Sequence, residues 1–295
     1  MTKRTLVGCY RSWVKKDRPK SIELLIALGL FCLAVVAVAV SPVAYGVDWI
    51  VFHDAGQRVW TGARLYGEPT SYQYYYNPPW LAVALTPLGL LPFRWGWAIV
   101  SVASLTVVVA LARRWQLGLA RLCFALLSPP VLYIVMYGQI DALVLGGILL
   151  PTWCWLLVAT AKPQVAIGLV FGVRRGQWMR AVVLTSAFLL ASFVLFGNWP
   201  VQLLQQPAPF VGSTHNLWQG LWPVQIPAGV ALVLLGIRRQ DERFLVAASP
   251  LLSPYAAVSS LLGLWLAGMA FMRDWEAGVV WLSWWGVIFY RSFTG

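Results

Sequence analysis

One aspartate, Asp48, directly follows the first long apolar run of the chain and opens the stretch 46–79, which contains no run long enough to span a membrane. If the preceding run is a transmembrane helix, the carboxylate lies at the membrane interface and not in bulk water. Partial removal from water makes a carboxylate a stronger base, so Asp48 has the type and place of a general base for a hydroxyl group. The alternative is that Asp48, like Asp54, is a solvated loop acid.

A lysine, Lys162, lies inside a long apolar run that begins at Ala142. An ammonium group there is costly unless it faces a partner or a cavity, so Lys162 is a candidate for binding an anion. Its side chain could instead extend to the interface. Gln139 and Asp141 directly precede this run. They either bind the hydroxyl groups of a sugar or cap the ends of broken helices, and the sequence leaves both interpretations open.

Further candidates for substrate binding lie in the two stretches expected outside the membrane. They are Arg58, Arg64 and Tyr66 in 46–79, together with His53 and the aromatic residues Tyr72, Tyr74, Tyr75, Tyr76 and Trp80, and His215 in 198–222. Sugar rings stack on aromatic faces, but such residues also form the aromatic belt of membrane proteins. No cluster of histidines and carboxylates has the spacing of metal ligands. We therefore expect no metal and no cofactor.

The elements that position these residues follow from the composition. Of 295 residues, 60% are hydrophobic and 11% charged, and the mean hydropathy is +0.71. A soluble domain of this length could not bury that much apolar surface. The sequence therefore predicts an all-α polytopic membrane helix bundle. The 18 Trp and 11 Tyr residues are typical of side chains that gather at membrane interfaces.

The net charge of +12 is distributed in short clusters between the apolar runs. The later clusters are Arg113, Arg114 and Arg121; Arg174, Arg175 and Arg180; and Arg238, Arg239 and Arg243. This is the pattern of cytoplasmic loops, which carry an excess of Lys and Arg. It places the N-terminus in the cytoplasm and argues against binding of nucleic acid. Four cysteines in apolar or cytoplasmic positions imply no disulfide framework.

The apolar runs predict one integral membrane domain, residues 1–295, with about eight spans. Residues 1–21 form a basic cytoplasmic segment, 46–79 an external juxtamembrane loop that contains a short amphipathic helix, and 198–222 a second external loop. Prolines interrupt several runs. We expect a short interfacial helix up to Pro92 followed by a span from Trp95 to Ala112, and a break in Leu122–Tyr137 at Pro129-Pro130.

Several motifs resemble, in the same order, those of the GT-C type polyprenyl-phosphate-dependent membrane glycosyltransferases, in particular glycosyltransferase family 87. They are Asp48, Ala55-Gly56, Val59, Gly62, Leu65-Tyr66, Asn77-Pro78-Pro79, Pro87-Leu88, Leu91-Pro92, Gly138-Gln139-Ile140-Asp141-Ala142-Leu143, Ala161-Lys162-Pro163-Gln164 and Leu252-Ser253-Pro254-Tyr255. The resemblance runs from about residue 22 to 272. Asn77 stands where the family usually has an aromatic residue, and Asp141 where it usually has Asn.

The resemblance implies inverting transfer of a mannose-like sugar from a polyprenyl-phosphate donor to a lipid or glycan acceptor, at the outer face of a bacterial-type plasma membrane. Asp48 matches the position of the family's catalytic base. Lys162 is the best candidate for the phosphate, and Gln139, Asp141, Arg58, Arg64, Tyr66 and His215 are candidates for binding substrate. The expected partners are membrane lipids, donor and acceptor, with other membrane subunits as a further option.

The chain is shorter than is usual for that family, and the loss falls between Asp141 and Lys162 and in the C-terminal third. This favours either a trimmed cavity for a small acceptor or a degenerate, non-catalytic GT-C-like subunit that serves as scaffold in a larger complex. The Trp-rich tail from Trp275 to Trp285 fits the second interpretation. A third interpretation is a transporter with broken helices, which is disfavoured because the predicted spans contain few acids that could couple transport to an ion.

Overall fold

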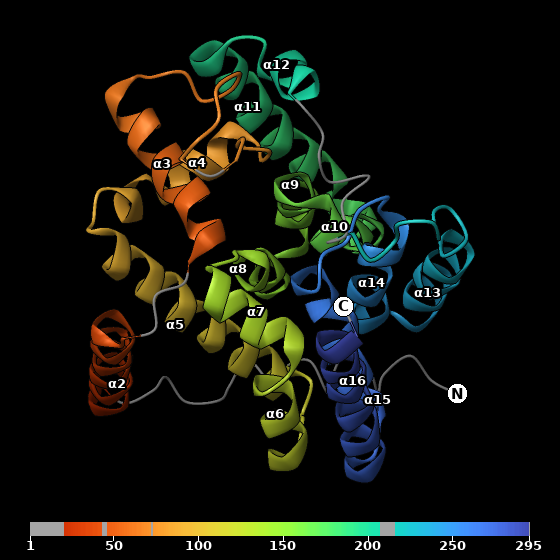
Figure 1. Cartoon of the computed structure of the whole chain (residues 1–295). Coiled ribbons are helices and arrows are strands. Elements are labelled where there is room, and N and C mark those ends of the chain that lie inside the picture. Colours follow the sequence, from red (N-terminus) through yellow and green to blue (C-terminus); the bar gives the residue numbers. More distant parts are fainter. Residues whose placement is uncertain (1–20, 43–45, 72, 207–215, 295) are drawn as a thin grey trace.

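The computed structural model describes residues 21–42, 46–71, 73–206 and 216–294 (Figure 1). Within these ranges the chain is all-helical, as the sequence predicts, and has no strand. The basic segment 1–21 lies outside the described residues except for Ser21, and His215 lies outside them as well.

Short helices dominate the described chain. In order, the α-helices are α2 Ser21–Val40, α3 Val47–Thr61, α4 Pro79–Gly89, α5 Phe93–Arg114, α6 Leu119–Leu126, α7 Pro129–Tyr137, α8 Asp141–Leu145, α9 Trp155–Ala161, α10 Pro163–Ala166, α11 Trp178–Phe196, α12 Trp199–Gln205, α13 Ile226–Arg239, α14 Glu242–Ala248, α15 Leu262–Phe271 and α16 Asp274–Thr294. The 3₁₀ helices are η1 Gly146–Leu149, η2 Thr152–Cys154, η3 Ile167–Gly172, η4 Arg175–Gln177, η5 Ser249–Leu252 and η6 Ser259–Leu261.

Two helical segments of the described chain are long and apolar enough to cross a membrane: Phe93–Arg114, and Arg175–Phe196, which joins η4 to α11. A third span results if α6 and α7, bent by 47° at the break between them, count as one. The other apolar helical stretches, Ala27–Val40 of α2 among them, have 10–17 residues, so the described helices do not establish the expected count of about eight. Prolines are the reason, because each one that ends a helix divides an apolar run, as Pro129 and Pro163 do.

Several of these helices leave apolar side chains uncovered. In α11 only 17% of the most apolar window is buried, against 56% in α5. Leu195 and Val194 of α11 are 72% and 84% exposed, and α2 and α16 also carry exposed leucine, valine and tryptophan side chains. Exposed apolar surface of this extent is typical of contact with lipid or with another protein.

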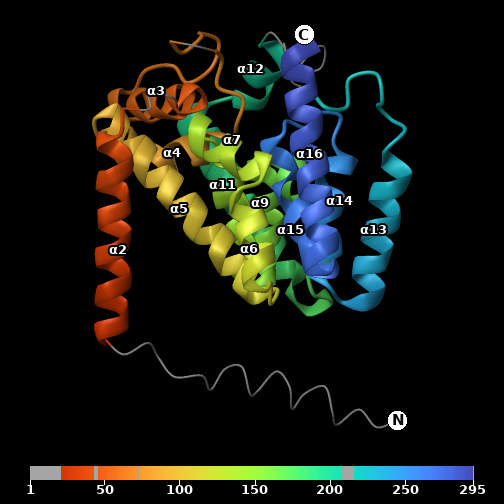
Figure 2. The ribbon, with the colours of Figure 1, turned by 60° about the horizontal axis from the view of Figure 1, so that its bottom comes forward.

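The two ends of the bundle differ in charge. Figure 2 shows α3 lying across one end of α2, whereas the C-terminal ends of α5 and α13 lie at the opposite end. There Arg114 donates to both carboxylate oxygens of Glu242, at 2.5 and 3.0 Å, and Arg121 lies 2.9 Å from Asp274. The predicted basic loops around Arg114, Arg121 and Arg239 therefore lie at one end, remote from α3.

The crosswise helix α3 packs most extensively against α4. Two glycines allow the backbones to touch: a Cβ on Gly56 would lie 3.2 Å from the Thr86 Cα, and one on Gly89 would lie 3.0 Å from the His53 carbonyl oxygen. On the other side of α3, the indole of Trp49 is fully buried and donates to the Phe93 carbonyl oxygen at 3.2 Å. These contacts fix the position of α3, and with it the position of Asp48.

Candidate functional site

Four of the residues singled out in the sequence meet at the start of α3. The Gln139 amide donates to Asp48 Oδ2 at 2.6 Å, and the Lys162 ammonium donates to Gln139 Oε1 at 2.7 Å. The same ammonium forms an ion pair with Asp141 Oδ1. We call Asp48, Gln139, Asp141 and Lys162 the Asp48 network. It joins the first turn of α3, the turn after α7, the first residue of α8 and the break between α9 and α10.

The turn after α7 is formed around a glycine. Gly138 ends α7 in the left-handed region, with φ +72°, and a Cβ there would lie 2.6 Å from the Trp49 Cβ. Only glycine therefore allows this turn to reach the backbone of α3. A hydrogen bond of 2.8 Å from the Gly46 N–H to the Met136 carbonyl oxygen joins the two elements at the same place. The side chain of Gln139 consequently points toward Asp48.

Lys162 lies at a helix break. Its backbone, with φ −153° and ψ 85°, is extended between α9 and α10, and Pro163 occupies the first position of α10. A proline disfavours the helical conformation in the residue before it, so the chain leaves the helix at Lys162. The ammonium is thereby directed into the bundle, where only 8% of the residue is exposed.

The charges of the Asp48 network are mostly removed from water. Asp141 is fully buried, whereas Asp48 and Gln139 are half-buried. Apart from the ion pair with Lys162, no hydrogen-bond partner among the described residues reaches either oxygen of Asp141. The ammonium of Lys162 thus pairs with one carboxylate, that of Asp141, and is linked to Asp48 through the Gln139 amide.

Two tyrosines that the sequence analysis did not select lie beside the network. Burial raises the pKa of the Tyr255 hydroxyl to about 12, and the nearby charges of Asp141 and Asp48 act in the same direction. Tyr133 of α7 lies near the same carboxylates, and its ring stacks on that of Tyr137 with 4.2 Å between the ring centroids. Tyr255 follows the Ser253-Pro254 motif, which was a usable signal. Tyr133 has no such signal, because it is one apolar-run residue among many.

The other predicted site residues lie elsewhere. The guanidinium of Arg58 donates to the carbonyl oxygens of Arg64, Glu68 and Pro69, at 3.4, 3.0 and 2.6 Å, and so holds the loop after α3. Tyr66 is buried and its hydroxyl donates to the Asn77 carbonyl oxygen at 2.7 Å. The loop that contains Tyr66 packs back on α3, since Tyr66 contacts Tyr75 and Tyr75 contacts Phe52. The hydrogen bonds of Arg58 and Tyr66 therefore hold this loop.

His53 also has a packing role in this structure. Its Nε2 lies 3.1 Å from the Leu91 carbonyl oxygen and its ring contacts Trp49 and Phe93 edge-on. Among the described residues, no group of three or more His, Cys, Asp or Glu side chains could hold a metal ion.

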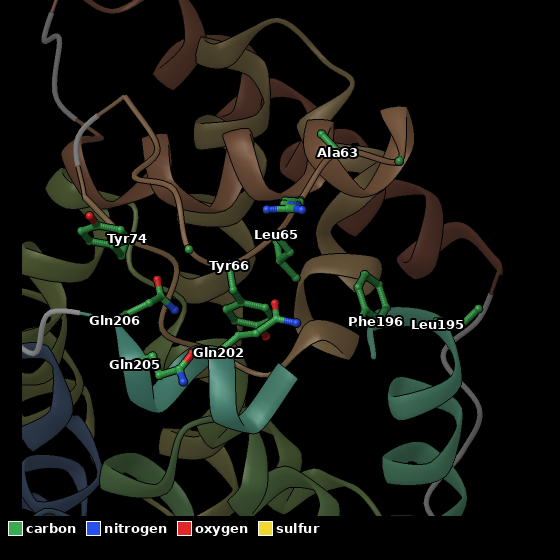
Figure 3. A pocket seen from close by; sticks show the side chains of 12 residues that line it. Ala63, Leu65, Tyr66, Tyr74, Leu195, Phe196, Gln202, Gln205 and Gln206 are labelled. Carbon is green, nitrogen blue, oxygen red and sulfur yellow. The ribbon is translucent and has the colours of Figure 1, made fainter. Parts of the chain in front are cut away.

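The far end of α3 carries a cavity of about 790 Å³ (Figure 3). Its wall includes Arg64, Tyr66 and Tyr74 from the loop after α3, and Gln202, Gln205 and Gln206 from α12 and the residue that follows it. No member of the Asp48 network lines it. The sequence candidates therefore divide into two places, one at each end of α3.

In the Asp48 network, the carboxylate of Asp48 can accept a proton, and the ammonium of Lys162 supplies a positive charge beside the buried Asp141. Gln139 connects the two, since its amide donates to one and accepts from the other. Comparison of the chain with protein-family models, with curated proteins and with solved structures found no match.

Proposed function

We propose that the chain is a membrane-embedded, inverting glycosyltransferase that uses a polyprenyl-phosphate-linked, mannose-like sugar and a lipid or glycan acceptor at the outer face of the membrane. One observation carries the proposal: Asp48, Gln139 and Lys162 come from three separate motifs of the family 87 resemblance and are joined by consecutive hydrogen bonds. Asp141, from the same motif as Gln139, completes the network.

In the proposed reaction, the carboxylate of Asp48 takes the proton of the acceptor hydroxyl. The acceptor oxygen forms a bond to the anomeric carbon from the side opposite the phosphate. The bond between that carbon and the phosphate oxygen breaks, and the lipid phosphate leaves with the electron pair. Lys162 is the cation that stabilises the charge on the leaving phosphate. Gln139 orients Asp48 and couples its position to that of the ammonium.

The membrane topology in this proposal is about eight spans with the N-terminus in the cytoplasm. The basic loops meet at the end of the bundle opposite α3, and cytoplasmic loops are rich in Lys and Arg, so this arrangement supports the proposed orientation with α3 outside. The exposed apolar side chains of α2, α11 and α16 support a lipid surround.

The test is transfer by the purified chain, reconstituted in lipid nanodiscs, from a polyprenyl-phosphate mannose donor to a mixture of bacterial glycolipids. Asp48→Asn keeps an oxygen that can accept from Gln139 but removes the base, so the rate should fall by about 10²–10⁴. Asp54→Asn is the matched control, because Asp54 lies on the same helix and bonds the N–H and hydroxyl of Ser71, at 3.0 and 2.7 Å. Equal transfer rates for the two variants would show that Asp48 is not the base.

One observation favours a second candidate, the non-catalytic membrane subunit. Lys162 is already paired with Asp141, and such a pair can serve to hold broken helices together without any ligand. This candidate predicts that the chain purifies as a stoichiometric complex through surfaces such as the exposed Trp275, Leu282 and Phe289 of α16. It also predicts no transfer with any polyprenyl-phosphate sugar.

A further inference from the structure

The cavity at the far end of α3 lies between the loop after that helix and α12. In Figure 3 the side chains of Tyr74, Gln206 and Gln205 follow one another across the view, and those of Tyr66 and Gln202 come next. Its volume of about 790 Å³ falls within the range of ~300–1,000 Å³ typical of small-molecule sites. The helices beside it, α3 and α12, lie at the end of the bundle opposite the C-terminal ends of α5 and α13 (Figure 2).

The wall of this cavity is polar but almost uncharged. Its three glutamines offer amide groups, each of which both donates and accepts hydrogen bonds. Among the described residues that line it there is no Asp or Glu, and the exposed Arg64 is the one charged side chain. A site for a cation needs carboxylates, and a site for a strong anion needs several converging cations. The wall matches a neutral ligand with many hydroxyl groups.

One glutamine has an unused acceptor. Gln206 is 5% exposed, and its Nε2 donates to the Tyr75 carbonyl oxygen at 3.2 Å, which fixes the orientation of the amide. Its Oε1 has no hydrogen-bond partner within the part of the chain that the structure describes. That oxygen has almost no accessible surface, so the amides that a ligand can reach are those of the exposed Gln202 and Gln205. The rings of Tyr66 and Tyr74 add apolar surface to the same wall.

We propose that this cavity binds a neutral oligosaccharide, which in the glycosyltransferase proposed above is the part of a glycan acceptor that lies several sugars away from the reacting hydroxyl. The inference rests on that function for the identity of the ligand. Gly62 in the wall of the cavity lies about 20 Å along α3 from Asp48, and an extended chain of several sugars can span that length.

Binding of mannotetraose and of cellotetraose to the full-length chain tests the proposal, with saturation-transfer NMR as the readout. Nanodiscs are required, because maltoside detergents carry sugar head groups. Gln202 and Gln205 are exposed, so Gln202→Ala together with Gln205→Ala removes two amides without opening a core. The double variant should bind at least one of the two sugars about tenfold more weakly. Leu204→Ala, on the same helix and 84% exposed, does not touch the cavity and should bind as the parent chain does.

Absence of binding by the parent chain, or equal binding by the double variant, overturns the proposal. Binding of sulfated oligosaccharides in place of the neutral ones overturns it as well. Asp48→Asn separates this inference from the proposed function, because it should abolish transfer and leave binding unchanged. Glutamine-dependent binding in a chain that never transfers sugar would support the cavity and refute the enzyme.

Discussion

Replacing Lys162 by methionine isolates the electrostatic contribution of the Asp48 network, because methionine keeps most of the side-chain volume and removes the charge. Asp141 is 0% exposed and Lys162 is 8% exposed, so the variant leaves a carboxylate in the bundle without its cation. Removal of one partner from a buried ion pair typically costs about 3–5 kcal/mol. We therefore expect Lys162→Met to lower the melting temperature strongly.

The second substitution of this experiment is Asp141→Asn in the Lys162→Met background. It removes the uncompensated charge and leaves an amide with unmade hydrogen bonds, which costs about 1–3 kcal/mol. The double variant should therefore be about 2 kcal/mol more stable than Lys162→Met alone, which is the signature of a coupled pair.

Thermal unfolding in nanodiscs, followed by the fluorescence of the 18 tryptophans, measures this order. Because unfolding of such a chain is not two-state, the test is the rank of the melting temperatures: parent, then double variant, then Lys162→Met. Arg180→Met removes the same charge from an exposed position and serves as control. A double variant that melts at or below Lys162→Met would refute the argument that the pair is buried and coupled.

Two further perturbations follow from other contacts. Gly138→Ala forces a methyl group within 2.6 Å of the Trp49 Cβ at a φ of +72°. It should destabilise the chain by about 1–3 kcal/mol, measured as a lower melting temperature. Gly176→Ala is the control and should leave the melting temperature unchanged, because the space around Gly176 is open. The side chain of Asp241 caps α14. Burial opposes its ionisation, but the hydrogen bonds from Arg243 outweigh burial and lower the pKa of its carboxyl group. The stabilisation by this carboxylate is therefore present above the ordinary Asp pKa of about 4 and is lost as the pH falls through the lowered value. Asp241→Asn should therefore cost about 1 kcal/mol at pH 7 and progressively less below pH 4, in melting curves recorded across that range.

Much of the helical architecture could be predicted from the sequence. The expected break at Pro129-Pro130 is confirmed, and so is the division at Pro92 into a short helix and a long one, because proline acts on its own neighbours in the chain. The expected amphipathic helix after the first apolar run is confirmed as α3. The number of spans could not be fixed, since the runs cut by prolines give helices too short to assign by length.

Which residues meet at the candidate site was harder to predict from the sequence. Lys162 and Gln139 were selected one at a time, but the hydrogen bonds that join them to each other and Gln139 to Asp48 depend on the bend between α6 and α7 and on the close approach at Gly138, which no local pattern encodes. Arg64 and Tyr66 were grouped with Asp48 because they are neighbours in sequence. Asp48 lies in the first turn of α3, whereas Arg64 and Tyr66 follow its last residue.

The bend of 47° between α6 and α7 determines the position of Gln139, which lies in the turn after α7. The nine residues of α7 extend for about 13 Å, so a straight continuation of α6 would carry its end about 10 Å to the side of its present position. That displacement exceeds the length of a glutamine side chain, and the amide would then reach neither acid nor lysine. Pro129 and Pro130, at the other end of α7 from this turn, thus set the direction of α7 and with it the position of the Gln139 amide.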